Sequence, residues 1–212
     1  MKLYSYWRST ASYRIRMALA LKELAYTQQS VDLAGGAQLA DGFTDISAQR
    51  LIPVLELETG ARLTQSQAIL DYLEQAHPEK PLLHADPLTR AQALAFGAAI
   101  ACDIHPLGNL RVQKYVGQTY GVGREGGPAW AKHWIELGFE ALETQAAARQ
   151  NAFLFAETPG YAECFLIPQI YNAKRFGVDM TVYPALSAIN AATLAWDGIA
   201  ASVPEAQPDA TP

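Results

Sequence analysis

The pattern of hydrophobic and polar positions changes its period several times in the first third of the chain, which is typical of an α/β unit. Short apolar runs predict strands over residues 3–7, 26–31, 52–57 and 62–64. Apolar positions at helical spacing predict helices over residues 12–24, 38–46 and 66–76. The order of these elements predicts that the first two strands pair in parallel across a right-handed crossover and that the last two form a hairpin.

The segment His77–Pro81 marks a boundary, because its prolines end the preceding helix and stiffen the connection. Beyond it the pattern is helical, over residues 88–120, 129–149, 161–176 and 183–203. Pro106 is expected to bend the first of these helices near residues 104–108. We therefore expect an α/β domain at 1–78, a linker at 79–87, an all-α domain at 88–204 and a flexible tail at 205–212.

Composition excludes several classes of protein. Half of the 212 residues are hydrophobic and 17% are charged, which is incompatible with an intrinsically disordered chain. The 16 Lys and Arg residues against 21 Asp and Glu residues give a net charge of −5, so nucleic acid is not an expected partner. The most apolar stretch, residues 91–104, is too short to cross a bilayer, so no membrane partner is expected.

The two cysteines, Cys102 and Cys164, lie far apart in the sequence and form neither a CxxC pair nor a cluster of metal ligands. We interpret both as buried, inert thiols and expect no metal site. This use of cysteine indicates a reducing compartment. Together with the composition, it leads us to expect a soluble cytoplasmic protein.

Candidate chemistry begins at the junction of the first strand and the first helix. Ser9, Thr10 and Ser12 place three hydroxyl groups at the start of that helix. Ligands of open α/β sheets bind at the carboxyl ends of the strands, and a helix N-terminus stabilises an anion. The alternative interpretation is simple helix capping, for which Ser and Thr are common residues.

Two further segments point to the same kind of ligand. If the peptide bond before Pro53 is cis, the backbone N–H and C=O groups of Val54 can turn outward and pair with a peptide-like ligand, although the trans form is more common. Gln65 and Ser66 precede and open the next helix, whose N–H groups can hold a carboxylate. An acidic peptide that carries a thiol would suit this surface.

These features resemble the thioredoxin-like domain of a glutathione transferase, and the all-α second domain agrees with that fold. Two segments resemble the zeta class more narrowly, namely residues 8–19, RSTASYRIRMAL, and residues 102–111, CDIHPLGNLR. That class comprises maleylacetoacetate isomerases and bacterial maleylpyruvate isomerases. The resemblance extends from Met1 to about Pro204 and implies glutathione as the cofactor and a homodimer as the assembly.

The resemblance also implies roles for individual residues. The catalytic hydroxyl is Ser9, with Thr10 and Ser12 nearby. The residues expected to bind a small dicarboxylate substrate are Arg8, Arg111 and Arg175. The residues expected to contact glutathione are Gln49, Pro53, Val54, Gln65, Ser66, His105 and Asn109. We interpret Arg14 and Arg16 as residues of the helix face with a structural role only.

The chain departs from the family pattern at two places. Ala11 occupies the position of a cysteine in the zeta signature, so the protein cannot supply a thiol there. Gly160 and Glu163 replace the Ser or Thr and the Asp of a capping box, and we expect the helix that follows them to form nevertheless.

The function implied by the resemblance is glutathione-dependent cis–trans isomerisation of maleylacetoacetate to fumarylacetoacetate in aromatic amino acid catabolism. The main alternative is maleylpyruvate isomerisation in gentisate degradation, which uses the same chemistry and which the missing cysteine favours slightly. A glutathione-binding carrier without turnover and a general glutathione transferase are the remaining alternatives. Three arginines able to pair with carboxylates argue against the carrier.

Overall fold

A four-stranded mixed sheet lies at the centre of the N-terminal part of the chain. In the computed structural model, which describes residues 1–211 except for the side chain of Arg124, its strands are β1 (Lys2–Ser5), β2 (Thr27–Ser30), β3 (Val54–Glu56) and β4 (Arg62–Thr64). Their order in the sheet is β2-β1-β3-β4. β1 and β2 are parallel, whereas β3 is antiparallel to both β1 and β4. The predicted crossover and the predicted hairpin are therefore confirmed.

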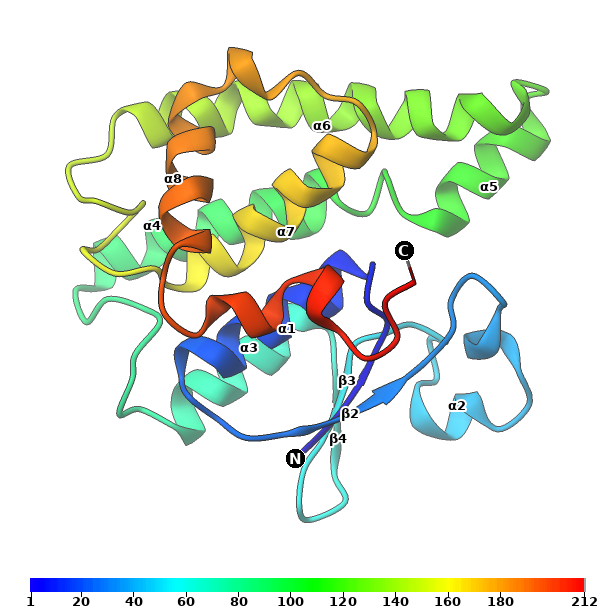
Figure 1. Ribbon diagram of the computed structural model, residues 1–212, viewed down its shortest axis with the longest axis horizontal. Helices are drawn as coiled ribbons and strands as arrows, with labels where there is room; N and C mark the ends of the chain where they lie inside the picture. The colour runs from blue at the N-terminus through cyan, green and yellow to red at the C-terminus, as the bar shows by residue number, and fades with distance from the viewer. Residues whose placement is uncertain (212) are drawn as a thin grey trace. The chain divides into compact units, whose positions relative to one another are not determined.

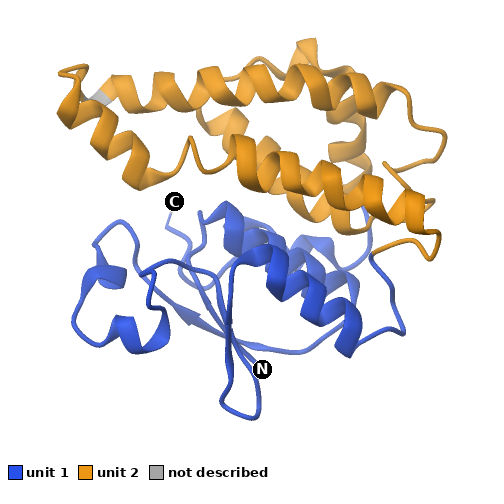
Figure 2. Ribbon diagram, turned by 180° about the vertical axis from the view of Figure 1, so that it is seen from behind, with its two compact units in different colours: residues 1–82, 195–212 blue, residues 83–194 orange. Residues whose placement is uncertain are grey.

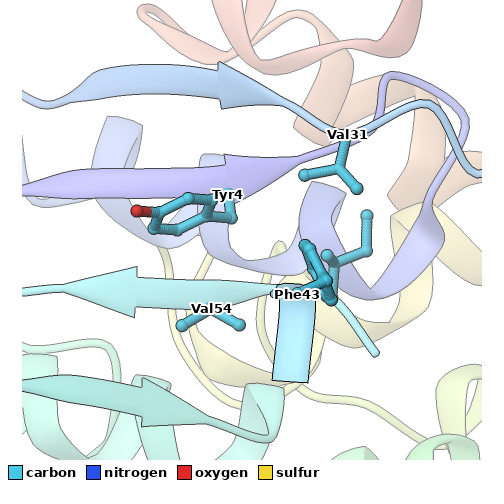
Figure 3. Packing of buried hydrophobic residues seen from close by; sticks show 5 residues of the cluster. Tyr4, Val31, Phe43 and Val54 are labelled. Atoms are coloured by element: carbon cyan, nitrogen blue, oxygen red, sulfur yellow. The ribbon is translucent and has the colours of Figure 1, made fainter. Parts of the chain in front are cut away.

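The two central strands of this sheet, β1 and β3, bury side chains on both faces. Tyr4 of β1 and Val54 of β3 lie opposite each other and pack with Val31, Ile52 and Phe43, the last from helix α2 (Phe43–Ile46) (Figure 3). Side chains alternate along a strand, so the neighbouring pair Leu3 and Leu55 points to the opposite face. Helices α1 (Thr10–Leu21) and α3 (Ser66–Ala76) lie side by side on that face (Figure 1). The short 3₁₀ segment η1 (Ala37–Leu39) precedes α2.

The second part of the chain is helical, as expected. Its helices are α4 (Pro87–Ala98), α5 (Leu110–Thr119), α6 (Gly123–Ala147), α7 (Tyr161–Arg175) and α8 (Pro184–Leu194), with a 3₁₀ turn η3 (Met180–Val182). α7 packs against both α4 and α8. Nearly all of its residues from Tyr161 to Ala173 are buried, which is the pattern of a helix at the centre of a core.

The chain around Pro106 differs from the expected bent helix. α4 continues into a π-helical segment, η2 (Ala99–Ile104), and then into a turn that contains Pro106. A new helix, α5, begins after Asn109, whose side chain accepts a hydrogen bond from the backbone N–H of Arg111 at 3.2 Å. The single helix predicted over residues 88–120 is therefore wrong, because a separate N-cap restarts the helix beyond the proline.

α7 forms in spite of the glycine at its N-cap. Glu163 accepts hydrogen bonds from the backbone N–H of Gly160 and from that of Leu154, both at 2.8 Å. Glycine has no side chain that could accept a hydrogen bond from the first turn. The side-chain hydrogen bonds of this capping arrangement therefore come from the Glu163 carboxylate alone. Burial raises the pKa of Glu163 above its ordinary value, while the backbone hydrogen bonds oppose that rise.

The division into compact units differs from the predicted boundaries at the C-terminus. One unit comprises residues 1–82 with 195–212, and the other comprises residues 83–194 (Figure 2). The first unit thus includes two 3₁₀ turns, η4 (Ile199–Ser202) and η5 (Pro204–Ala206). Residues 195–204 were expected to join the helical domain, but they pack with the sheet domain instead.

The segment expected to be a flexible tail also makes specific contacts in the first unit. Gln207 is buried, and Asp209 accepts a hydrogen bond from the backbone N–H of Trp7. The predicted tail therefore has anchors, although they are polar and not apolar. Pro212, its last residue, lies outside the described residues. Among the residues that the structure describes, no helix combines the length and the hydrophobicity that crossing a bilayer requires.

Candidate active site

Ser9 is the N-cap of α1. Its Oγ accepts a hydrogen bond from the backbone N–H of Ser12 at 3.2 Å, and its own N–H donates to the carbonyl oxygen of Tyr6 at 2.9 Å. The capping interpretation is therefore confirmed for this residue. It does not exclude an anion site, because a hydroxyl that accepts through its oxygen still has a hydrogen to donate. The first turn of α1 contains no acidic residue that would neutralise the positive end of the helix.

The three hydroxyl groups differ in exposure. Ser9 is half-buried, whereas Thr10 and Ser12 have 5% and 0% of their surface exposed. The Oγ atom of Ser12 is buried and has no hydrogen-bond partner among the described residues. Ser9 is thus the hydroxyl of this group that a ligand can reach most easily, and the other two lie beneath the start of the helix.

The start of α3 gathers four of the residues expected to bind glutathione. Val54 pairs with Thr64 at the end of β4, directly before Gln65 and Ser66. Gln65 has a left-handed backbone with φ of 67°, and its Nε2 donates to Oε1 of Gln49 at 2.6 Å. No acidic residue lies in the first turn of α3. The peptide bond between Ile52 and Pro53 is cis.

Arg14, in the second turn of α1, connects this helix to the start of α3. It is 2% exposed, and its Nη1 donates to Oγ of Ser66 at 3.0 Å. Because Ser66 accepts from a guanidinium, its hydroxyl hydrogen is left to donate elsewhere. The sequence indicated only a structural role for Arg14 on the helix face. The buried contact with a candidate binding residue was missed, and the only signal was that Arg14 and Arg16 are the charged residues of a helix without acidic residues.

Of the remaining candidates, Arg8 lies in the first unit and the others lie in the second unit. His105 and Asn109 flank the turn before α5, and Arg111 is exposed in the first turn of that helix. Arg175, exposed at the end of α7, donates from Nη1 to Oδ1 of Asn172 at 3.2 Å. Arg8 is exposed, with Cζ 4.1 Å from the centre of the Trp7 ring.

The candidate residues therefore fall into two groups, one on each compact unit. Exposed guanidinium groups can pair with carboxylates, and the hydroxyls and helix starts of the first unit can hold an anion. Cys164 is buried as expected, but Cys102 is exposed, so the prediction of a buried thiol is wrong there. Within the described part of the chain, no cluster of three or more His, Cys, Asp or Glu side chains could hold a metal ion.

Comparisons with known proteins agree with this architecture. Residues 8–76 match the family model of the glutathione S-transferase N-terminal domain. The maleylpyruvate isomerase of a Ralstonia species is 41% identical over 212 residues, which cover 99% of each chain. The solved holo structure of a maleylpyruvate isomerase, described as a bacterial glutathione S-transferase of the zeta class, has a TM-score of 0.96 at 39% identity and full coverage of both chains.

The maleylacetoacetate isomerase of Methylobacterium extorquens AM1, solved with bound malonate and glutathione, is equally similar in fold. Its TM-score is 0.96 at 36% identity, and all of both chains is covered. The fold and these relatives define a glutathione S-transferase. The chain belongs to the zeta class of that family, the group of the maleylacetoacetate and maleylpyruvate isomerases.

Proposed function

We propose that this protein catalyses the glutathione-dependent cis–trans isomerisation of maleylacetoacetate to fumarylacetoacetate. The observation that carries the proposal is the start of α1, where Ser9 presents a half-buried hydroxyl at a helix N-terminus without an acidic residue. Such a site stabilises an anion, and a helix N-terminus lowers the pKa of a nearby thiol below its usual value of about 8.5. Ala11 leaves this chain without a thiol of its own there.

The residues of the first unit fit glutathione. α1 and α3 begin without acidic residues, whereas α4 and α7 are capped by Asp86 and Glu163. A tripeptide with a thiol and carboxylates can therefore occupy the first two helix starts without repulsion from the protein. The solved relative from Methylobacterium extorquens contains glutathione, which supports the same assignment here.

When bound, glutathione supplies the thiolate that adds to the cis double bond and is eliminated after rotation. Ser9 donates a hydrogen bond to the sulfur and favours its ionised form, with Thr10 and Ser12 beneath it. Gln65, Ser66, Gln49 and the backbone of Val54 hold the peptide, and His105 and Asn109 are proposed as further contacts. Each contact aligns the thiolate and so lowers the entropic part of the barrier.

Arg8, Arg111 and Arg175 are proposed to bind the carboxylates of the substrate. Arginine pairs with carboxylates through two parallel hydrogen bonds and remains charged at every accessible pH. The protein as a whole carries a net charge of −5, which repels a dianionic substrate. The guanidinium groups must therefore attract the substrate locally and overcome this repulsion. The malonate bound in the Methylobacterium extorquens structure is a small dicarboxylate and supports this class of ligand.

Maleylpyruvate is the second candidate substrate. It is favoured by the 41% identity to the Ralstonia isomerase and by the absence of a cysteine at Ala11. The two reactions share one mechanism and differ in the length of the substrate chain. We also propose a cytoplasmic location and, as is usual for the family, a homodimer. Sedimentation of the purified protein would test the homodimer.

A paired assay tests the proposed function. The purified protein is incubated with maleylacetoacetate or maleylpyruvate, each with and without glutathione, and with chlorodinitrobenzene as the general transferase substrate. The proposal requires turnover of a maleyl substrate only when glutathione is present, and faster than conjugation of the chloroarene. Turnover of neither maleyl substrate would leave the carrier as the better interpretation.

Matched variants test the arginines in the same assay. Arg111→Ala and Arg175→Ala are compared with Lys114→Ala and Lys174→Ala, which remove exposed positive charges from the same two helices. The arginine variants should raise KM for the maleyl substrate about tenfold or more, as expected for a lost charge-assisted hydrogen bond. Equal effects in the lysine variants would show that only the overall charge matters.

A further inference from the structure

The C-terminal segment 199–209 lies against the loop that leads from β1 into α1. Figure 1 shows this segment in red beside the end of β1, and the hydrogen bonds agree. Gln207 stabilises the fold of the segment itself, because its Nε2 donates to the carbonyl oxygens of Ala201 and Val203 at 2.9 and 2.7 Å. The contacts join residues about two hundred positions apart in sequence, within one compact unit.

Asp209 binds two elements of the sheet domain at once. Its Oδ2 accepts from the backbone N–H of Trp7 at 3.0 Å, and its Oδ1 accepts from Nε2 of Gln28 in β2 at 3.1 Å. Both carboxylate oxygens are therefore used, and charge-assisted hydrogen bonds of this kind are stronger than neutral ones. The carboxylate therefore holds the Tyr6–Trp7 peptide, and Arg8 and Ser9 follow Trp7 directly.

Arg16 holds the same loop from the other side. It is 1% exposed, and its Nη2 donates to the carbonyl oxygen of Trp7 at 3.1 Å. Its Nη1 lies 3.5 Å from the carbonyl oxygen of Tyr6, and its Nε donates to that of Ser202 at 2.9 Å. The guanidinium therefore binds the loop and the C-terminal segment together, which the sequence did not indicate.

The N–H of Trp7 is thus held by the carboxylate of Asp209 in the C-terminal segment, and its C=O is held by the guanidinium of Arg16 in α1. Ser9 follows two residues later, and its backbone N–H donates to the Tyr6 carbonyl that Arg16 also approaches. A backbone fixed in this way limits where the Ser9 hydroxyl can lie. Errors of about 1 Å in such positions can cost about 100-fold in rate.

We propose that Asp209 is a positioning residue for the active site, acting together with Arg16 by fixing the Trp7 peptide and through it Ser9. This inference rests on the proposed function, in which Ser9 stabilises the glutathione thiolate. Asp209 itself touches neither the cofactor nor the substrate in this scheme. The C-terminal segment is accordingly part of the catalytic framework of the sheet domain.

Two substitutions separate the hydrogen bonds from the charge. Asp209→Ala removes both acceptors. Asp209→Asn keeps one oxygen for the Trp7 N–H, and its new amide can donate to Oε1 of Gln28, which is buried and has no hydrogen-bond partner among the residues that the structure describes. A rotated Gln28 amide thus restores the second bond. Asp197→Ala is the matched control, because it removes an exposed carboxylate from the same unit.

The first readout needs no turnover. Hydrogen exchange of the Trp7 amide, followed by NMR, should be about tenfold faster or more in Asp209→Ala, since a charge-assisted hydrogen bond is lost. The exchange rate of the Trp7 amide should stay within about twofold of the wild-type rate in Asp209→Asn and in Asp197→Ala. An unchanged Trp7 amide in folded Asp209→Ala would overturn the inference, because the tail would not be holding the loop.

The second readout concerns the chemistry. Asp209→Ala should lower kcat about tenfold and raise the pKa of the bound thiol, with KM for the maleyl substrate changed less than about threefold. Asp209→Asn should recover most of this loss. Faster amide exchange with unchanged kcat and thiol pKa would overturn the positioning role. If Asp209→Ala does not fold, Gln28→Ala, which frees one carboxylate oxygen, should give smaller changes in the same directions.

Failure of the proposed function is distinguishable from failure of this inference. If the wild-type protein shows no glutathione-dependent isomerisation, the proposed function fails whatever Asp209 does. If the wild-type protein isomerises a maleyl substrate and Asp209→Ala matches it in kcat and in thiol pKa, only the positioning role fails.

Discussion

Arg14 donates a hydrogen bond from Nη1 to Oγ of Ser66 at 3.0 Å, although 52 residues separate them in sequence. The contact is buried and joins α1 to the first residue of α3. It fixes the lone pair that Ser66 uses as an acceptor and leaves its hydrogen available to a ligand carboxylate. The start of α3, which can hold an anion, is in this way tied to α1.

Replacing Ser66 with alanine should weaken glutathione binding by about 10- to 150-fold. The reason is the loss of one hydrogen bond to a charged group, worth about 1.5–3 kcal/mol. Titration calorimetry measures the dissociation constant directly, and Ser30→Ala, at an exposed serine of β2, is the control. Equal dissociation constants for the wild type and Ser66→Ala would remove Ser66 from the site.

Arg8→Ala should raise KM for the maleyl substrate about tenfold or more while glutathione binding changes less than about threefold. Arg8 is exposed, so its removal costs the fold little beyond the contact of its guanidinium with the Trp7 ring, whereas the substrate loses a partner for its carboxylate. Steady-state kinetics at saturating glutathione, together with calorimetry, separate the two effects. A parallel loss in both would show that Arg8 holds the cofactor and not the substrate.

The dependence of stability on pH contains a contribution from Glu56. Hydrogen bonds from Arg62 and Lys2 hold the pKa of Glu56 at about 2, below its ordinary value of 4.5. A carboxyl group whose pKa is lower in the folded state stabilises the fold above its unfolded pKa, and this contribution is lost as the pH falls towards the folded pKa. Glu56 therefore stabilises the protein above about pH 4.5.

Glu56→Gln should accordingly have a lower urea midpoint than the wild type near pH 7, and the difference should shrink as the pH falls towards about 2. Glu58→Gln, at an exposed position on the same hairpin, is the control and should show little change at any pH. A difference between Glu56→Gln and the wild type that is independent of pH would contradict the assigned ion pairs.

Gly97 marks a close approach of α4 to α7. A Cβ atom at this position would lie 2.7 Å from Cε1 of Tyr161 and 3.0 Å from Cδ2 of Phe165, both of which are buried. Gly97→Ala should therefore destabilise the protein by about 1–3 kcal/mol. At an exposed helix position without such a close approach, the same substitution would instead stabilise it by about 1 kcal/mol. Thermal unfolding measures this, and a stabilised variant would show that the helices can separate.

Most elements of the sheet domain were predictable because their patterns are local. The single helix predicted over residues 38–46 is wrong, because η1 and α2 divide that stretch and Gly42 between them has a left-handed backbone with φ of 87°. The helix over Ser66–Ala76 and the strand over Arg62–Thr64 have the bounds that the sequence predicts. The helix break after Pro106 was not predictable from the proline alone, since the new N-cap at Asn109 decides that a second helix begins. Local propensity gives the kind of element more reliably than its ends.

The contacts that organise the candidate site depend on tertiary structure. Arg16 has the sequence pattern of a surface residue, yet it is buried because several carbonyl oxygens and a serine hydroxyl converge on it. Asp209 follows a proline in a segment without apolar anchors, and its partners are a backbone N–H and a glutamine far away in sequence. Neither a period nor a motif encodes contacts of this kind.

The pKa of the glutathione thiol in its complex with the protein tests the central claim most directly. The thiolate absorbs in the ultraviolet more strongly than the thiol, so difference spectra of the complex at increasing pH report its ionisation without turnover. In the wild type the pKa should lie at least about one unit below the free value of about 8.5, and Ser9→Ala should raise it, with Ser9→Thr restoring most of the shift. Loss of the N-cap costs about 1 kcal/mol of stability in the alanine variant, which thermal unfolding accounts for separately. A bound thiol that titrates like free glutathione in the wild type, or identically in the wild type and Ser9→Ala, would contradict the account.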